Sequence, residues 1–336
     1  IEKKNLRRVS CKYNKLTSIE PLSDMKIEWL NCRGNEIRDL TPLRNQPLKH
    51  LNCAYNQISD ISPLNVRSLF TLYAQSNQIK EISRLRTAPL LEINLSGNKI
   101  SSIEPLRGKK IENMIINSNT ISDISALEGM PLKYLFCSDN QIVRLDALEK
   151  CTTLTEIVCA DNKIMSLDPL RGIPLVFVNC SKNRIGSLAP LRTDNLKYIN
   201  CADNPLQSLA PFLDSRPPDR FYYFSKTIAR QAVQEAIAAW AGDAIMITHT
   251  RNARILLAIV ENRIADLKRF ASEFNNHHYL FIPWHLTKND ASRFAQQAGG
   301  HLVSLNGRNE EIFVNRLSEN RTDFWVDCYG DEENMH

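Results

Sequence analysis

The sequence predicts an α/β solenoid of about ten stacked coils, with a parallel sheet along its concave side, over residues 1–215. The first observation is an asparagine that recurs every 21 residues, apart from one step of 22. The second is a set of apolar residues at fixed offsets from that asparagine, which gives each coil one apolar side. A single coil has nothing to bury that side against, so we expect the coils to stack around one continuous core. The recurring residues are Asn14, Asn35, Asn56, Asn77, Asn98, Asn119, Asn140, Asn162, Asn183 and Asn204.

Residues 48–64 show the pattern of one coil. The apolar positions of this coil are Leu48, Leu51, Cys53, Ile58, Ile61 and Leu64. Written as L-x-x-L-x-C/L-x-x-N-x-I-x-x-L-x-P-L, the pattern runs through about residues 1–213 and resembles the leucine-rich repeat family. The resemblance implies a right-handed horseshoe. The asparagine amide can pair with backbone groups that a tight turn leaves unbonded, so we expect a structural role for it. Proline before the closing leucine favours a short 3₁₀ or extended segment over a full helix.

The recurring asparagines are called ladder asparagines below. Seven of the nine cysteines lie three residues before one of them, at an inward strand position. They are Cys11, Cys32, Cys53, Cys137, Cys159, Cys180 and Cys201. We expect them to act as small hydrophobic residues, because pairs spaced as zinc ligands are missing. Free thiols favour a reducing, intracellular compartment, and a surface location stays open if a targeting signal lies upstream of Ile1. Cys151 and Cys328 lie outside this column and are candidates for reactive thiols.

Composition excludes several classes of function. The net charge of +5 is spread along the chain without a dense basic block, so we expect no nucleic-acid partner. The longest apolar candidate, Ile255–Val260, is too short to span a membrane. Nucleophile motifs, phosphate-binding loops and metal-ligand sets are missing, and we expect a non-catalytic protein without a cofactor. His277-His278 and the acidic run 331–333 are interpreted as solvated turns.

The candidate site lies on the concave sheet. Residues six and four positions before each ladder asparagine point to that surface, because successive strand residues alternate between faces. In the second half of the solenoid these positions form one apolar and aromatic field: Ile115, Tyr134, Phe136, Val158, Phe177 and Tyr198. Trp29, His50 and Tyr73 are separate candidates in the first half. Such a field favours a protein partner. The alternatives are coverage by the chain's own C-terminal part and a plain exposed surface.

Residues 216–276 are expected to form a helical cap or linker, since Pro217 and Pro218 follow the end of the repeats near Asp214. Apolar stripes predict one helix over about 226–241 and another over about 252–274. A short strand is expected at 244–248. The last coil needs such a cap, because its apolar side would otherwise face water.

Residues 277–336 carry a second pattern, with strands expected at 279–282, 301–305 and 324–326 and helices at 288–298 and about 309–317. The order of Trp284, Gly299-Gly300 and Phe324-Trp325-Val326 resembles the first half of the α+β C-type lectin-like fold. The resemblance implies carbohydrate recognition, with the solenoid as a spacer, as an alternative function. It implies calcium as a cofactor only if a complete lectin-like domain follows, because the calcium region would come after His336. We therefore expect the chain to be a piece of a longer protein.

Overall fold

The computed structural model describes residues 6–191, 195–209, 212, 220–222, 228, 230–240, 253–255, 257–258, 272–274, 277–281, 301–302 and 325–329. The chain divides into two compact units, which are described separately. The first comprises Ile1–Asn204 with Pro218–Phe221, and the second comprises Pro205–Pro217 with Tyr222–His336. The expected three-part division into 1–215, 216–276 and 277–336 stays a prediction.

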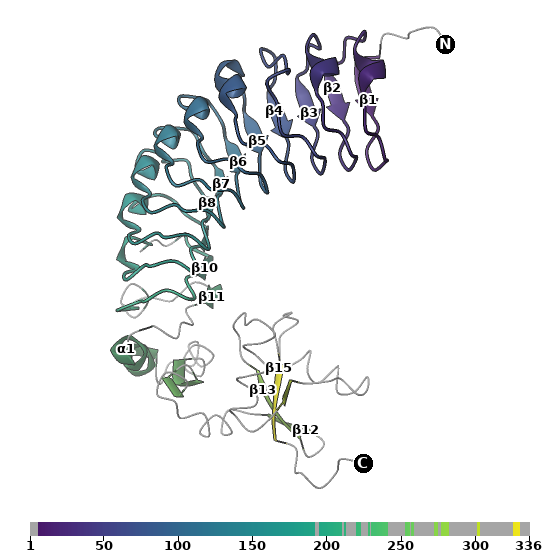
Figure 1. Ribbon diagram of the computed structural model, residues 1–336. Helices are drawn as coiled ribbons and strands as arrows, with labels where there is room; N and C mark the ends of the chain where they lie inside the picture. The colour runs from purple at the N-terminus through teal and green to yellow at the C-terminus, as the bar shows by residue number, and fades with distance from the viewer. Residues whose placement is uncertain are drawn as a thin grey trace, which may run out of the picture. The chain divides into compact units, whose positions relative to one another are not determined.

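The first unit is a solenoid whose strands form one sheet in sequence order, from β1 to β11. Each pairing from β1 to β10 is parallel and joins residues one coil apart, so Trp29 pairs with His50. Within this unit the strands line the inner side of an arc (Figure 1). The strands are β1 (Arg8–Ser10), β2 (Trp29–Asn31), β3 (His50–Asn52), β4 (Thr71–Tyr73), β5 (Glu92–Asn94), β6 (Asn113–Ile115), β7 (Tyr134–Phe136), β8 (Glu156–Val158), β9 (Phe177–Asn179), β10 (Tyr198–Asn200) and β11 (Arg220–Tyr222). The predicted parallel solenoid is confirmed.

Short 3₁₀ turns form the outer side of the arc, as the proline positions predicted (Figure 1). Proline is the second residue of η1, η2, η4 and η7. Its fixed φ suits the start of a helical turn, where the missing N–H costs no hydrogen bond. The turns are η1 (Glu20–Leu22), η2 (Thr41–Leu43), η3 (Ser83–Thr87), η4 (Glu104–Leu106), η5 (Ser125–Leu127), η6 (Asp146–Leu148), η7 (Asp168–Leu170) and η8 (Ala189–Leu191).

The core lies between the sheet and these turns. The middle residue of each strand from β2 to β10 is buried, as is the residue that follows the strand. In β3 these residues are Leu51 and Cys53, which are 1% and 0% exposed. The cysteine column therefore packs as the spacing predicted. Cys11, in the first coil, is only half-buried because no coil precedes it in the described chain.

The interpretation of Cys151 as a reactive thiol is wrong for the folded chain. Its side chain is buried, and its Sγ lies 3.4 Å from the backbone oxygen of Leu127, to which the thiol donates. Burial also raises the pKa of the thiol, which disfavours the reactive thiolate. The expectation for Cys328 concerns a side chain outside the described ones.

The recurring asparagines form a ladder that joins neighbouring coils. Asn56 shows the arrangement: its Nδ2 donates to the backbone oxygens of Cys53 in its own coil and Cys32 in the preceding coil, both at 3.1 Å. Its Oδ1 accepts a hydrogen bond from the Ile37 N–H at 3.0 Å. The amide therefore satisfies three backbone groups that the turns leave unbonded, and the structural role predicted for it is confirmed.

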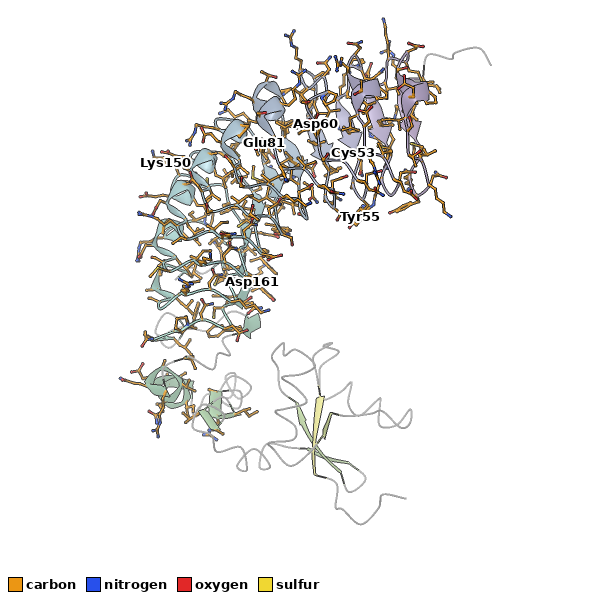
Figure 2. All side chains as sticks on the ribbon, in the orientation of Figure 1. Cys53, Tyr55, Asp60, Glu81, Lys150 and Asp161 are labelled. Atoms are coloured by element: carbon orange, nitrogen blue, oxygen red, sulfur yellow. The ribbon has the colours of Figure 1, made fainter. Side chains whose placement is uncertain are left out.

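The residue before each ladder asparagine has a positive φ, the left-handed conformation that closes the turn. These residues are Tyr13, Gly34, Tyr55, Ser76, Gly97, Ser118, Asp139, Asp161, Lys182 and Asp203. Figure 2 shows two of them, Tyr55 and Asp161, on the inner side of the arc, whereas Lys150 lies on its outer side. This column, called the turn column below, thus places ten residues along one edge of the concave sheet, and eight of them have a side chain.

The second unit contains helix α1 (Arg230–Trp240), within the predicted helix 226–241, and its Ala232, Val233 and Ala236 are buried. Residues 253–255 and 257–258 are also helical. The prediction that this second helix continues to Phe274 is wrong: residues Ser272–Phe274 form strand β12, which pairs with β13. The sequence signal for this hairpin is Asn275-Asn276, the two residues between the paired Phe274 and His277, because asparagine is common in two-residue hairpin turns.

Three strands complete an antiparallel sheet with the order β12-β13-β15-β14. They are β13 (His277–Phe281), β14 (His301–Leu302) and β15 (Trp325–Tyr329). These strands overlap the three strands predicted from the sequence. The expected strand 244–248 and helices 288–298 and 309–317 lie outside the described residues, and the lectin-like resemblance stays a prediction.

Candidate functional site

The expected apolar field forms two rows on the concave sheet. One row contains Ile115, Phe136 and Val158, which pair directly across β6, β7 and β8. All three are half-buried, so each leaves part of its side chain on the concave surface. Because paired strands are about 4.8 Å apart, the three side chains lie side by side.

The other row contains Tyr134, Glu156, Phe177 and Tyr198 in successive strands. The Phe177 and Tyr198 rings are stacked, with centroids 4.1 Å apart and planes 3° from parallel. Tyr134 is 39% exposed and is separated from Phe177 by Glu156. The field is therefore apolar with one carboxylate inside it, and the register brings together all six residues singled out in the sequence.

The candidates of the first half are arranged differently, because each has a polar or charged neighbour. Arg8 lies over the Trp29 ring, with its Cζ 5.1 Å from the ring centroid. His50 Nδ1 lies 3.1 Å from Thr71 Oγ1. These residues form local pairs and no continuous apolar surface.

Tyr73 is held by an acidic neighbour in the next strand. Its hydroxyl donates a hydrogen bond of 2.6 Å to Oε1 of Glu92. Partial burial, this hydrogen bond and the negative charge of Glu92 raise the pKa of Tyr73 to about 12. The phenol is thus fixed as a donor within the fold, which reduces its freedom to bind a partner.

Sequence reasoning missed a cluster made by Tyr13, Arg33 and Tyr55 in the first three coils. The Arg33 guanidinium lies 5.7 Å from the Tyr13 ring centroid and 4.5 Å from that of Tyr55. Both tyrosines are exposed, at 65% and 48%. The available signal was their shared position, since both residues directly precede a ladder asparagine.

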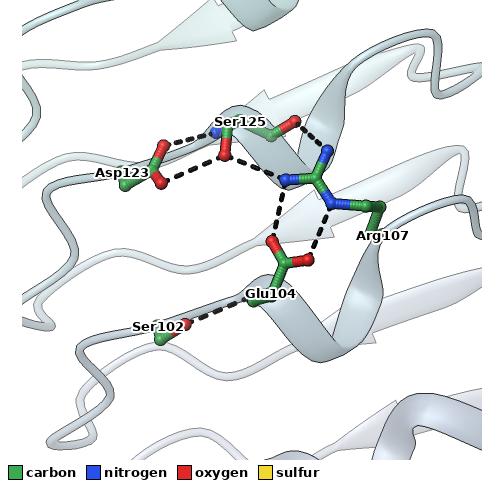
Figure 3. Close-up of polar contacts among 5 residues, drawn as sticks. All are labelled: Ser102, Glu104, Arg107, Asp123 and Ser125. Atoms are coloured by element: carbon green, nitrogen blue, oxygen red, sulfur yellow. Dashed lines mark hydrogen bonds and ion pairs between the residues drawn. The ribbon is translucent and has the colours of Figure 1, made fainter.

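Polar networks on the outer turns link neighbouring coils. Arg107 bonds both carboxylate oxygens of Glu104, through Nε at 2.7 Å and Nη2 at 2.8 Å, and reaches the Ser125 hydroxyl of the next coil at 3.0 Å (Figure 3). The Ser125 hydroxyl in turn donates to Asp123. The hydrogen bond from Arg107 lowers the pKa of Glu104. Every charged group in this network has a partner, and we assign it a structural role.

Among the described residues, no three metal-binding side chains come together. Within the same part of the chain, no helix combines the length and apolar character that a membrane span needs.

Residues 132–172 match a family model for leucine-rich repeats in two copies. This match and the parallel solenoid define the class: the chain contains leucine-rich repeats. No match was found among curated proteins. Leucine-rich repeats generally mediate protein–protein interaction.

Three solved structures are similar to the chain. Internalin InlF from Listeria monocytogenes has a TM-score of 0.57 and 24% identity, covering 70% of this chain and 78% of that one. The functional domain of InlJ from Listeria monocytogenes, which includes a cysteine ladder, has a TM-score of 0.52 and 26% identity, covering 61% and 46%. The leucine-rich repeat ectodomain of the receptor kinase GASSHO1/SCHENGEN3 from Arabidopsis thaliana, in complex with CASPARIAN STRIP INTEGRITY FACTOR 2, has a TM-score of 0.54 and 19% identity, covering 63% and 29%.

Proposed function

We propose that this chain is a non-catalytic binding module whose concave face holds a protein partner. The observation that carries the proposal is the apolar field of Ile115, Tyr134, Phe136, Val158, Phe177 and Tyr198. Contiguous exposed apolar surface on a soluble domain marks interaction sites, and aromatic residues often supply most of the binding energy. Trp29 and His50 would contribute polar contacts at the other end of the face, and Tyr73, whose hydroxyl donates to Glu92, would contribute its ring.

The stacking of Phe177 on Tyr198 supports the proposal, because the two rings are already ordered in the free protein. Ordering a side chain on binding costs roughly 0.5–1.5 kcal/mol. A partner that packs on ordered rings avoids most of that cost. Glu156, beside Phe177 in the same row, would select for a partner with a donor or a positive charge at that point.

The test compares two double variants in their affinity for a purified partner, measured by calorimetry. Phe136→Ala with Phe177→Ala removes the centres of both rows, and we expect binding to weaken by more than about 1 kcal/mol. The matched control is Val143→Ala with Met165→Ala, which removes two side chains that are 42% and 62% exposed and lie outside the concave rows. Unchanged affinity of a well-folded Phe136→Ala/Phe177→Ala variant would contradict the proposal.

A second candidate function is carbohydrate recognition by the lectin-like segment 277–336, with the solenoid as a spacer. Its support is the sequence resemblance and the three predicted strands that β13, β14 and β15 overlap. Glycan binding that requires calcium, and that survives the Phe136→Ala/Phe177→Ala change, would favour this function over partner binding by the solenoid.

A further inference from the structure

The cluster of Tyr13, Arg33 and Tyr55 is built by three consecutive coils. Tyr13 and Tyr55 occupy the turn position of the first and third coils, and Gly34 occupies it in the second. Gly34 has φ +68°, and a Cβ there would lie 2.8 Å from Cδ1 of Tyr13. The missing side chain thus makes room for the Tyr13 ring, and Arg33, the residue before Gly34, extends its guanidinium between the two tyrosines.

Arg33 has aromatic neighbours and no anionic partner. In the described part of the chain its side chain makes no hydrogen bond or ion pair, and its Nε is buried without a partner. Arg33 as a whole is only half-buried, so the accessible donors are its terminal nitrogens. Four other arginines of the described solenoid have carboxylate partners, among them Arg7 with Glu28 at 2.8 Å and Arg171 with Asp168 at 2.9 Å. A buried unpaired N–H next to exposed donors is a feature that a ligand can explain.

The charge around Arg33 is positive. The concave positions and adjoining turn positions of the first three coils contain no carboxylate. They are Arg8, Ser10, Lys12, Tyr13, Trp29, Asn31, Arg33, Gly34, His50, Asn52, Ala54 and Tyr55. The nearest strand-flanking acid, Glu28, is already paired with Arg7 and Lys49. The turn column is uncharged from Tyr13 to Ser118, and its later members are Asp139, Asp161, Lys182 and Asp203.

We infer that Arg33, held between Tyr13 and Tyr55, binds a carboxylate of an acidic peptide segment at the N-terminal end of the concave face. A guanidinium fixed in its plane by two rings keeps its edge free for the two oxygens of a carboxylate. Arg8 and Lys12 supply further positive charge for neighbouring acidic residues. The surface is an isolated cluster without the basic groove that follows a phosphate backbone, so a nucleic-acid strand fits it less well.

The test uses a short fluorescein-labelled peptide rich in glutamate, the same peptide with glutamine, and a deoxythymidine oligonucleotide, each titrated with the chain. We expect saturable binding of the glutamate peptide. The glutamine peptide should bind at least about tenfold more weakly. Arg33→Gln should weaken the binding of the glutamate peptide about tenfold. Arg33→Lys should also weaken it, because a lysine keeps the charge and loses the planar fork.

The matched control is Arg67→Gln, which removes the same charge from an exposed residue outside the concave face and should leave affinity within about twofold. Tyr55→Leu retains Arg33 and removes the nearer ring, so a severalfold loss is expected there. Circular dichroism melting of each variant verifies folding. Three results would overturn the inference: no saturable binding of the glutamate peptide, equal losses in Arg33→Gln and Arg67→Gln, or tighter Arg33-dependent binding of the oligonucleotide. The Phe136→Ala/Phe177→Ala variant should bind the peptide normally, so the inference stands or falls independently of the proposed function.

Discussion

Phe177 and Tyr198 are directly paired in adjacent parallel strands, and their rings stack at 4.1 Å with planes 3° from parallel. The coil repeat produces this geometry: equal offsets from successive ladder asparagines place both residues at the same point of their strands. Strand spacing of about 4.8 Å then brings flat side chains close to contact distance. The regular spacing in the sequence therefore produces an ordered aromatic pair on the concave sheet.

This pair predicts a measurable coupling. A double-mutant cycle with Phe177→Ala and Tyr198→Ala, followed by urea unfolding, should give a coupling energy of about 0.5–1.5 kcal/mol beyond the separate losses. The expected sign is stabilising, because offset or parallel rings gain contact that neither ring makes alone. Additive losses would show that the two rings do not support each other in solution.

The stability lost when a ladder asparagine is replaced by alanine should depend on its position in the solenoid. Asn56→Ala removes the partner of the Ile37 N–H and of the Cys32 and Cys53 backbone oxygens, so urea unfolding should show a loss of about 2–4 kcal/mol. Asn14→Ala should cost about 0.5–1 kcal/mol, because the Asn14 side chain is exposed and, among the described residues, bonds only the backbone oxygens of Cys11 and Lys12 in its own coil.

The control for both ladder variants is the exposed Asn45, on an outer turn, where alanine should change stability by less than about 0.5 kcal/mol. Equal losses at Asn56 and Asn14 would contradict the account, since it attributes the difference to bonds with a preceding coil.

The cysteine column predicts protection from alkylation. Burial raises the pKa of Cys53 and Cys159 to about 12, so very little thiolate exists near neutral pH. In the folded protein we expect iodoacetamide to label Cys11 before Cys53, because Cys11 is half-buried and Cys53 is fully buried. Peptide mass spectrometry measures the order, and labelling after denaturation is the control. Rapid labelling of Cys53 without unfolding would refute the stacked core.

Tyr73 predicts a loss of stability at alkaline pH. Its pKa is raised from 10.0 to about 12 by burial and by Glu92, so the fold favours the protonated phenol. That contribution is fully present below the unfolded pKa of 10.0 and is lost as the pH rises to about 12. Urea unfolding of wild type and Tyr73→Phe should therefore differ most below pH 10 and converge towards pH 12. A difference that is constant over this range would contradict the hydrogen bond to Glu92.

The repeat made the solenoid predictable from sequence, because one short pattern fixes the strand, the turn and the buried side of every coil. The same periodicity predicts that Phe136 and Val158 lie side by side, and the two residues pair across β7 and β8. Features that occur once were not predictable. Gln46 bonds the Ile27 N–H from a fully buried position, and nothing in the period marks it. The Arg33 cluster depends on the missing Cβ at Gly34, which leaves room for the Tyr13 ring of the preceding coil.

The end of the helix predicted at 252–274 was missed for a different reason. Apolar spacing around Phe274 fits a helix, but β12 exchanges backbone hydrogen bonds with β13, and such pairing overrides local preference. The apolar spacing of a short segment does not distinguish a helix from a strand, because it does not show whether another strand is available for pairing.

The central claim is that the concave face contacts a protein partner, and photo-crosslinking tests it most directly. A benzophenone amino acid is placed at Phe136, in the concave field, or at Met165, outside it, and the chain is irradiated with its purified partner. We predict covalent capture from position 136 and little from position 165. Equal capture from both positions, or capture from position 165 alone, would contradict the claim.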